Sequence, residues 1–214
     1  MKRIFFTAVT IMMAVTGAFS QSDKYEGAMK TNIAQLDSGV AKGTISELAN
    51  NFERIGNAEK TQWLPYYYAA YCTVMASYLN PDKSKTDETA DKAEAFITKA
   101  EQLAGGENSE ICVIKSMIAS AHMMVDPQNR WQQYGAASSG NIEKAKKMDP
   151  TNPRPIYLDG QSKFYTPEQF GGGKVVAKPV LEKALAMFAT FKPASSLAPV
   201  WGKASTQYFI NECN

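Results

Sequence analysis

The chain has 214 residues, and its 23 basic and 21 acidic residues give a formal net charge of +2. Lys2 and Arg3 lie in a segment that we expect to be removed, which leaves 21 charges of each sign. Nothing in this balance indicates a nucleic acid or a membrane surface as a partner.

Residues 1–20 have the features of a secretory signal peptide, with a basic start, an apolar run from Ile4 to Val15, and small residues at Ala18 and Ser20. The apolar run has 12 residues, fewer than the roughly 20 that span a bilayer. A retained interfacial anchor is the alternative. We expect cleavage near Ser20/Gln21, a periplasmic or secreted protein, and no membrane insertion after cleavage.

Residues 21–60 predict a helical hairpin, with helices over 24–40 and 44–57. Thr44-Ile-Ser-Glu47 has the spacing of a capping box, in which the two polar side chains bond each other's backbone N–H groups. This hairpin is either a cap or a degenerate copy of the repeats that follow.

Three later segments resemble one another, at residues 93–103, 138–148 and 177–187. Each has a small residue, Ile or Leu four positions on, then Lys-Ala, and Leu or Met three positions further. The copies begin 45 and 39 residues apart, which is typical of stacked helical hairpins.

The segments between these copies also repeat, at residues 65–70, 155–160 and 199–204, each with Pro, an aromatic residue two positions later and Ala or Gly five positions later. Proline is favoured in the first turn of a helix, so it marks where each of these helices begins. We expect helices over 61–79 and from Asn108 or Ser109 to about Val125. Asn152-Pro153 starts another helix, and a terminal helix over 199–211 caps the stack.

The pattern of residues 138–150, closed by Asp149-Pro150, resembles the second helix of the tetratricopeptide repeat. Residues 166–185 look like the Gly-Gly junctions of some periplasmic tetratricopeptide-like proteins, including transporter-associated ones, and the whole chain looks like exported tetratricopeptide-repeat proteins of Bacteroidetes. The resemblance implies an all-α fold of helical hairpin repeats (an α-solenoid) over 61–214. The ordinary repeat has about 34 residues, so longer loops within each repeat are expected here.

Three cysteines, Cys72, Cys112 and Cys213, would enter an oxidising compartment. A Cys72–Cys112 disulfide between neighbouring repeats is one interpretation. The other is that both are small buried apolar residues, as free cysteines often are.

No set of residues indicates catalysis, so we expect a protein that is not an enzyme and has no cofactor. Gly171-Gly172-Gly173-Lys174 lacks the first glycine and the Ser or Thr of a phosphate-binding loop, because Glu168 and Val175 occupy those positions. His122 is the only histidine, which is too few for a catalytic triad or a multi-histidine zinc site. His122-Met123-Met124 offers soft ligands for copper, although methionines at helical spacing are typical of a core.

Aromatic residues recur at equivalent repeat positions, where stacking would align them along one surface able to hold a peptide or a sugar. Packing between helices is the alternative explanation. The residues that we predict to bind a partner are Tyr67, Tyr71, Arg154, Tyr157, Gln161, Tyr165 and Trp201. The sequence favours an exported scaffold for a protein or peptide partner in the cell envelope, and a periplasmic binder of a glycan or carboxylate is the alternative.

Overall fold

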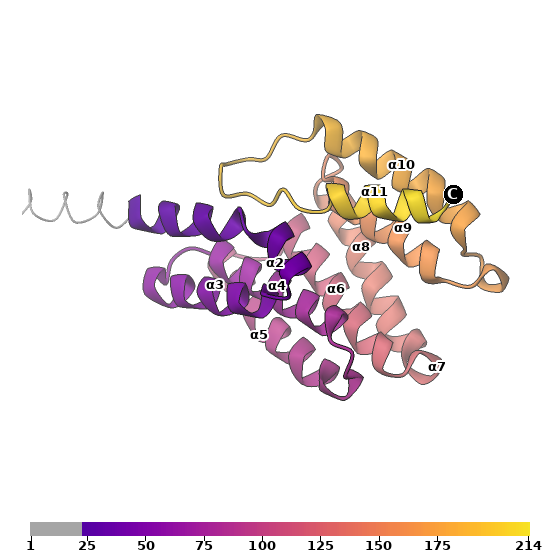
Figure 1. The fold of residues 1–214 in the computed structure, drawn as a ribbon, viewed down its shortest axis with the longest axis horizontal. Coiled ribbons are helices and arrows are strands. Elements are labelled where there is room, and N and C mark those ends of the chain that lie inside the picture. The colour runs from indigo at the N-terminus through magenta and orange to yellow at the C-terminus, as the bar shows by residue number, and fades with distance from the viewer. Residues whose placement is uncertain (1–22) are drawn as a thin grey trace, which may run out of the picture.

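The computed structural model describes residues 23–214, and the predicted signal peptide lies outside the described residues. Over the described range the chain is helical and contains no strand. The prediction of an all-α protein is therefore confirmed for this part of the chain (Figure 1).

The N-terminal segment differs from the predicted pair of helices. Residues 23–33 are helical, a turn follows in which Gln35 N bonds to Asn32 O, and α2 then spans Leu36–Lys42. The predicted helix over 24–40 is therefore broken, and the second predicted helix corresponds to α3 (Ile45–Glu59). The predicted capping box is also wrong, because Thr44 has ψ 12° rather than an extended backbone, and among residues 23–214 its side chain caps no N–H.

The repeated segments lie on helices as predicted. Residues 93–103, 138–148 and 177–187 fall on α5, α8 and α10, which are the second members of three helix pairs. The remaining elements are α4 (Leu64–Leu79), η1 (Lys83–Lys85), α5 (Thr86–Ala104), α6 (Ser109–Val125), α7 (Pro127–Arg130), the π-helical turn η2 (Trp131–Gly135), α8 (Ala136–Met148), α9 (Pro153–Tyr165), η3 (Glu168–Phe170), α10 (Lys174–Thr190) and α11 (Lys203–Glu212).

Two helix starts form as the sequence predicts. The Oδ1 atom of Asn108 accepts from Ile111 N at 3.0 Å, which caps α6. In the same way Asn152 Oδ1 accepts from Arg154 N at 3.0 Å, and Pro153 occupies the first turn of α9. Each asparagine satisfies one of the backbone donors that a helix N-terminus leaves free.

The helices pack in chain order. Each helix from α3 to α6 contacts the next one, and the same holds along the series α6, α8, α9, α10 and α11. In addition α4 contacts α6 and α6 contacts α9. These three helices therefore form an inner row, and α5, α8 and α10 cover it from outside (Figure 1).

Most residues of helix α4 are buried. Its consecutive residues Tyr66, Tyr67 and Tyr68 are all at most 1% exposed. Because neighbouring residues of a helix point about 100° apart, burial of all three requires partners on several sides. The almost uniformly apolar sequence of this helix is consistent with such burial.

Residues 191–202, which we call the strap, join α10 to α11 and run back over the N-terminal helices (Figure 1). The strap buries Leu197 and Trp201. The terminal helix was predicted to begin at Pro199, but α11 begins at Lys203, after Gly202 at φ 110°. Trp201 thus lies in a turn, whereas Tyr67 and Tyr157 lie within α4 and α9.

Cys72, Cys112 and Cys213 are free, so the Cys72–Cys112 disulfide is wrong. Both of those thiols are buried, and Cys112 Sγ lies 3.9 Å from Met148 Sδ. They behave as small core residues. Across residues 23–214, no helix has both the length and the apolar character needed to cross a bilayer.

Candidate functional site

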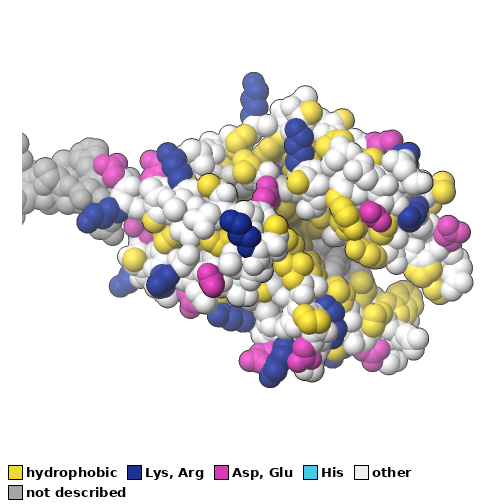
Figure 2. All heavy atoms as spheres, in the orientation of Figure 1, with side chains coloured by type: hydrophobic (Ala, Val, Ile, Leu, Met, Phe, Trp, Pro, Cys, Tyr) yellow, Lys and Arg dark blue, Asp and Glu magenta, His cyan; other side chains and the backbone are white. Residues whose placement is uncertain are grey.

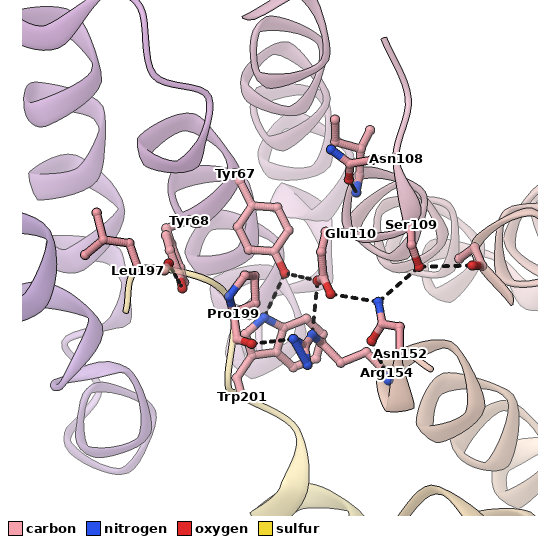
Figure 3. A network of polar contacts seen from close by, with 12 residues as sticks. Tyr67, Tyr68, Asn108, Ser109, Glu110, Asn152, Arg154, Leu197, Pro199 and Trp201 are labelled. Carbon is pink, nitrogen blue, oxygen red and sulfur yellow. Dashed lines mark hydrogen bonds and ion pairs between the residues drawn. The ribbon is translucent and has the colours of Figure 1, made fainter. Parts of the chain in front are cut away.

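A buried polar network joins α4, α6, α9 and the strap (Figure 3). Glu110 Oε2 accepts from Tyr67 OH at 2.8 Å and from Arg154 Nε at 3.0 Å, and Oε1 accepts from Asn152 Nδ2 at 2.7 Å. Trp201 Nε1 donates to Tyr67 OH at 2.9 Å. One carboxylate therefore holds together segments that are far apart in the sequence.

Arg154 is fully buried and is directed toward the strap. Its Nη2 donates to Pro199 O, and its guanidinium lies 4.9 Å from the ring centre of Phe191 and 5.6 Å from that of Trp201. Nη1 has no hydrogen-bond partner among the described residues. Arg154 thus anchors the strap and does not present its charge at the surface.

The tyrosines of this network are neutral hydrogen-bond donors. Burial raises the pKa of Tyr67, and the neighbouring Glu110 raises it further. Burial likewise raises the pKa of Tyr68, whose hydroxyl donates to Leu197 O at 2.9 Å. Ionisation of either hydroxyl would place an unneutralised charge in the core.

The residues predicted to bind a partner divide into a buried and an accessible group. Tyr165 is 69% exposed, and Gln161 is half-buried. The other five side chains are at most 6% exposed. Their aromatic rings and the guanidinium group contact neighbouring helices and the strap, as expected if these residues serve packing between helices. These five are Tyr67, Tyr71, Arg154, Tyr157 and Trp201.

An aromatic cluster forms where α9 meets α11. The Phe209 ring centre lies 5.2 Å from that of Phe164, 5.7 Å from Tyr165, 5.4 Å from Tyr208 and 6.3 Å from Tyr157. Tyr165 and Tyr208 are 69% and 57% exposed, whereas Phe209 is buried. The buried ring therefore supports two tyrosines whose faces are open to solvent.

A hollow lies between this end of the molecule and the helices around α6 and α7, and hydrophobic side chains are visible on both of its borders (Figure 2). The large apolar residues exposed on α6 and η2 are Met124, at 39%, and Trp131, at 59%. On α9 and α11 they are Tyr165 and Tyr208. A concave surface with apolar borders is the usual form of a small-molecule site.

Polar groups also connect the inner helices to their neighbours. Tyr78 on α4 donates to Met117 O on α6, and burial raises the pKa of Tyr78, with Tyr157 as a further cause. Gln161 Nε2 donates to Tyr157 OH at 3.2 Å. Burial also raises the pKa of Tyr157, against a smaller lowering by the hydrogen bond with Ser205 of α11. The hydroxyls here are thus protonated at neutral pH.

His122 holds α7 and η2 against α5. Its Nδ1 lies 2.8 Å from Asp87 Oδ1, its Nε2 lies 3.6 Å from Asp91 Oδ1, and its ring stacks on Tyr134 with centres 5.0 Å apart. Arg130 Nη1 is 2.7 Å from the same Asp87 oxygen, and the hydrogen bonds from Arg130 and then His122 lower the pKa of Asp87. Among residues 23–214, no group of three or more His, Cys, Asp or Glu side chains is arranged to hold a metal ion.

Two shallow recesses lie elsewhere. One, of about 450 Å³, includes Trp63, Glu107 and Met148 in its lining, and the other, of about 340 Å³, includes Ile45 and Leu79. Glu107 is paired with Lys115 and Lys144 at 2.9 and 2.8 Å. Trp63 is the only aromatic residue in the lining of the first recess, and the second has none, so the hollow, whose flanking elements expose several aromatic side chains, is the stronger candidate site.

Sequence reasoning missed Phe164, Tyr208 and Phe209. The last two lie on the segment that was interpreted as a terminal cap, so their rings were not considered for binding. The run Gln207-Tyr-Phe-Ile210 carries a weak signal, because it places an exposed aromatic beside a buried one.

The comparisons with known proteins identify one similar solved structure. No protein-family model matches the chain, and no curated protein matches it. The structure is similar to that of the HusA haemophore from Porphyromonas gingivalis, with a TM-score of 0.77 and 39% sequence identity. The match covers 88% of this chain and 92% of the haemophore chain. With this identity over nearly the full length of both proteins, the chain belongs to the family of the HusA haemophore.

Proposed function

We propose that this protein is an exported, non-catalytic binding protein for haem or a closely related porphyrin, which it holds in the hollow. The similarity to a haemophore at 39% identity is the observation that carries the proposal. It favours the small-molecule alternative over the protein scaffold that the repeats suggested, and it changes the ligand from a glycan or carboxylate to a porphyrin.

The large apolar side chains exposed on the elements that flank the hollow fit the chemistry of a porphyrin. A porphyrin is a planar aromatic ring, so it gains from apolar burial and from stacking on exposed aromatic faces. Tyr165 and Tyr208 present such faces, and Phe209 supports both from below. Trp131 and Met124 on the α6–η2 side offer apolar contacts of the kind that a flat ligand would bury.

The proposal depends on ring contacts and not on histidine ligation. The side chain of His122 is 12% exposed, with Nδ1 bonded to Asp87 and the ring stacked on Tyr134. Its Nε2, the nitrogen that a metal would bind, lies 3.6 Å from Asp91 Oδ1, so iron would have to displace this carboxylate. Haem is therefore treated as a carried ligand, not as a resident catalytic cofactor.

Titration of the mature protein with haemin tests the proposal. We expect the Soret absorption band of haemin to shift and the tryptophan fluorescence of the protein to be quenched. Both signals should saturate at the same haemin concentration. Two stacking partners each contribute about 1 kcal/mol, so the double variant Tyr165→Ala/Tyr208→Ala should bind about thirtyfold more weakly, since each 1.4 kcal/mol is a factor of ten.

Phe170→Ser is the matched control, because Phe170 is 72% exposed but lies on the convex turn between α9 and α10. It should bind haemin as the wild type does. Circular dichroism must show that each variant keeps its helical content. A wild-type protein that leaves the haemin spectrum unchanged would refute haem binding, and full affinity in the double variant would refute this location.

Export is part of the proposal. The basic start, apolar run and small residues of positions 1–20 support it, as does membership in a haemophore family. Mass spectrometry of the protein recovered from the periplasm or medium of its own cells should give a mature chain that begins near Gln21. Recovery of a chain that still begins at Met1 would contradict this expectation.

We also infer a tetratricopeptide-like arrangement from the pairs α4–α5, α6–α8 and α9–α10, with α11 as the terminal cap. The contacts of α4 with α6 and of α6 with α9 support it, because they align the first helices of the pairs. A protein or peptide partner in the hollow is the second candidate function on this ground. Residues 21–214 could be used to capture an envelope protein in stoichiometric amount. Displacement of that protein by haemin would support the binding of both ligands at the same surface.

A further inference from the structure

The connection between α6 and α8 contains no buried residue. It consists of α7 and η2, residues 127–135, which we call the flap. Trp131 of the flap is 59% exposed, and only Arg130, Tyr134 and Gly135 are half-buried. Segments with few buried contacts open locally at the lowest cost in free energy. The flap should therefore open more easily than the helices on either side of it.

The flap has a defined shape and a break in regular structure at each end. Asp126 precedes it with φ −149° and ψ 79°, outside the helical region, and the Asp126 carboxylate accepts from the backbone and side-chain amides of Asn129, at 3.3 and 2.8 Å. At the other end η2 is a π-helical turn, a rare conformation that is frequent at functional sites. Gly135 ends this turn, and glycine restrains the backbone least. The flap can thus move as one unit about its two ends.

One carboxylate, that of Asp87 on α5, holds the flap. Arg130 Nη1 donates to both oxygens of Asp87, at 2.7 and 2.9 Å, and also to His122 O at 3.1 Å. His122 Nδ1 lies 2.8 Å from Asp87 Oδ1, and the His122 ring stacks on Tyr134 of the flap. The hydrogen bonds from Arg130 and then His122 lower the pKa of Asp87, so the latch is charged at neutral pH.

This latch is accessible to water, unlike the ion pair that anchors the strap. The side chains of Asp87 and Arg130 are 39% and 30% exposed, whereas those of Glu110 and Arg154 are 15% and 0% exposed. Ion pairs that water reaches contribute little to stability, because solvent screens their attraction. The latch therefore favours the closed flap without preventing it from opening.

We propose that the flap opens about its two ends, with Asp87 as its latch, and that this opening sets the rates at which a ligand enters and leaves the hollow. η2 lies on one flank of the hollow and carries the exposed Trp131, so its movement changes the width of the entrance (Figures 1 and 2). Segments that control access to a site are drawn from the least stable parts of a fold. The gating role rests on the proposed function, but the opening itself does not.

Hydrogen exchange of the mature protein without ligand, followed by mass spectrometry, tests the opening. We expect the amides of residues 127–135 to exchange faster than those of α6. Asp87→Asn and Arg130→Met should each speed this exchange about fivefold, through loss of a partly exposed ion pair. Both variants are needed, because Asp87 also lies in the first turn of α5, where a negative charge favours the helix.

Asp91→Asn is the matched control. Asp91 lies one turn after Asp87 on α5 and is 75% exposed, and it approaches only His122 Nε2, at 3.6 Å. This variant removes the same charge from the same helix but leaves the bond between Asp87 and Arg130 in place. Its flap should exchange as the wild-type flap does, and circular dichroism should show that all three variants keep their helical content.

Stopped-flow mixing with haemin tests the gating role. In the two latch variants we expect the association and dissociation rate constants to rise together, about fivefold, with Kd within about twofold of the wild type, because the closed form remains the major one. A contact that only shapes the bound state would change mainly the dissociation rate. Asp91→Asn should show the wild-type rates.

Each result bears on a separate step. A wild-type flap that exchanges as slowly as α6, or latch variants that exchange like the wild type, would overturn the opening. Faster exchange with unchanged haemin rates, or with a change confined to dissociation, would overturn the gating role. A wild type that leaves the haemin spectrum unchanged would overturn the proposed function and gating with it, and the exchange rates would still decide whether Asp87 latches the flap.

Discussion

Among single residues, Glu110 has the most partners from distant segments, and its charge is matched to the fully buried Arg154. Its side chain is 15% exposed and accepts from Tyr67, Asn152 and Arg154. A buried ion pair offers little net stability over an apolar pair, but removal of one partner leaves the other uncompensated. The value of Glu110 is thus that it makes burial of Arg154 possible.

We therefore predict that Glu110→Gln lowers the free energy of unfolding by about 3–5 kcal/mol. Trp201→Phe should cost less, about 1 kcal/mol, because it removes one neutral hydrogen bond to Tyr67. Urea denaturation followed by circular dichroism measures both. If Glu110→Gln lowers the free energy of unfolding by less than Trp201→Phe does, another group must neutralise the guanidinium of Arg154.

The ionisation of Asp159 should make the stability of the protein depend on pH. Burial acts to raise its pKa, but hydrogen bonds from Lys146 and Lys163, at 2.8 and 2.6 Å, outweigh burial and lower it. A carboxyl with a lowered folded pKa contributes stability above its unfolded pKa of about 3.9, and this is lost as pH falls through the folded value.

Asp159→Asn should therefore lower the melting temperature at pH 7, and the gap from the wild type should narrow as the pH falls below about 4. Thermal melts across this range provide the measurement. If the difference in melting temperature between Asp159→Asn and the wild type stays constant with pH, the loss of stability comes from packing alone.

At the scale of elements, the α9–α10 contact depends on close approach at Gly160. A Cβ atom there would lie 2.7 Å from both Cγ and Cδ2 of Leu181, which is itself fully buried. The small residue that recurs in this repeated segment thus lets the second helix pack closely.

Gly160→Ala should destabilise the protein by about 1–3 kcal/mol through overpacking. Gly140→Ala on α8 is the matched control, because a Cβ there meets no heavy atom within 4 Å. It should stabilise by about 0.5–1 kcal/mol, since alanine favours the helix. Chemical denaturation of the two variants side by side checks the contrast, and equal effects would refute the role of close packing.

At the scale of the whole molecule, stability comes from packing without covalent cross-links. All three cysteines are free, and Cys72 and Cys112 lie in the core, where burial raises the pKa of each thiol. A raised thiol pKa lowers the thiolate fraction and hence the reactivity. We expect the melting temperature of the monomer to be the same with and without a reducing agent, as measured by thermal unfolding. A lower melting temperature under reduction would reveal a disulfide.

The residues predicted to bind a partner show which properties the sequence alone could not predict. Tyr165 was predicted and is exposed, but Tyr71 and Trp201 stack on each other with ring centres 4.5 Å apart and are both buried. A local sequence pattern identifies an aromatic position, but it does not indicate which other segment of the chain covers that ring. Here Trp201 of the strap covers the Tyr71 ring, and the path of the strap depends on contacts with Tyr67, Tyr68 and Arg154, which are far away in the sequence.

The sequence by itself determined the helical class, the helices that carry the repeated segments, and the caps at Asn108 and Asn152. These depend on periodicity and on hydrogen bonds within a few residues, which are local properties of the chain. Only the tertiary structure decided that the strap folds back over α4, that α11 begins at Lys203, and that Tyr208 and Phe209 pack with Tyr165 in one aromatic cluster. Those features arise from long-range packing and from the buried charge of Arg154, whose partner Glu110 is brought to it only when the helices assemble.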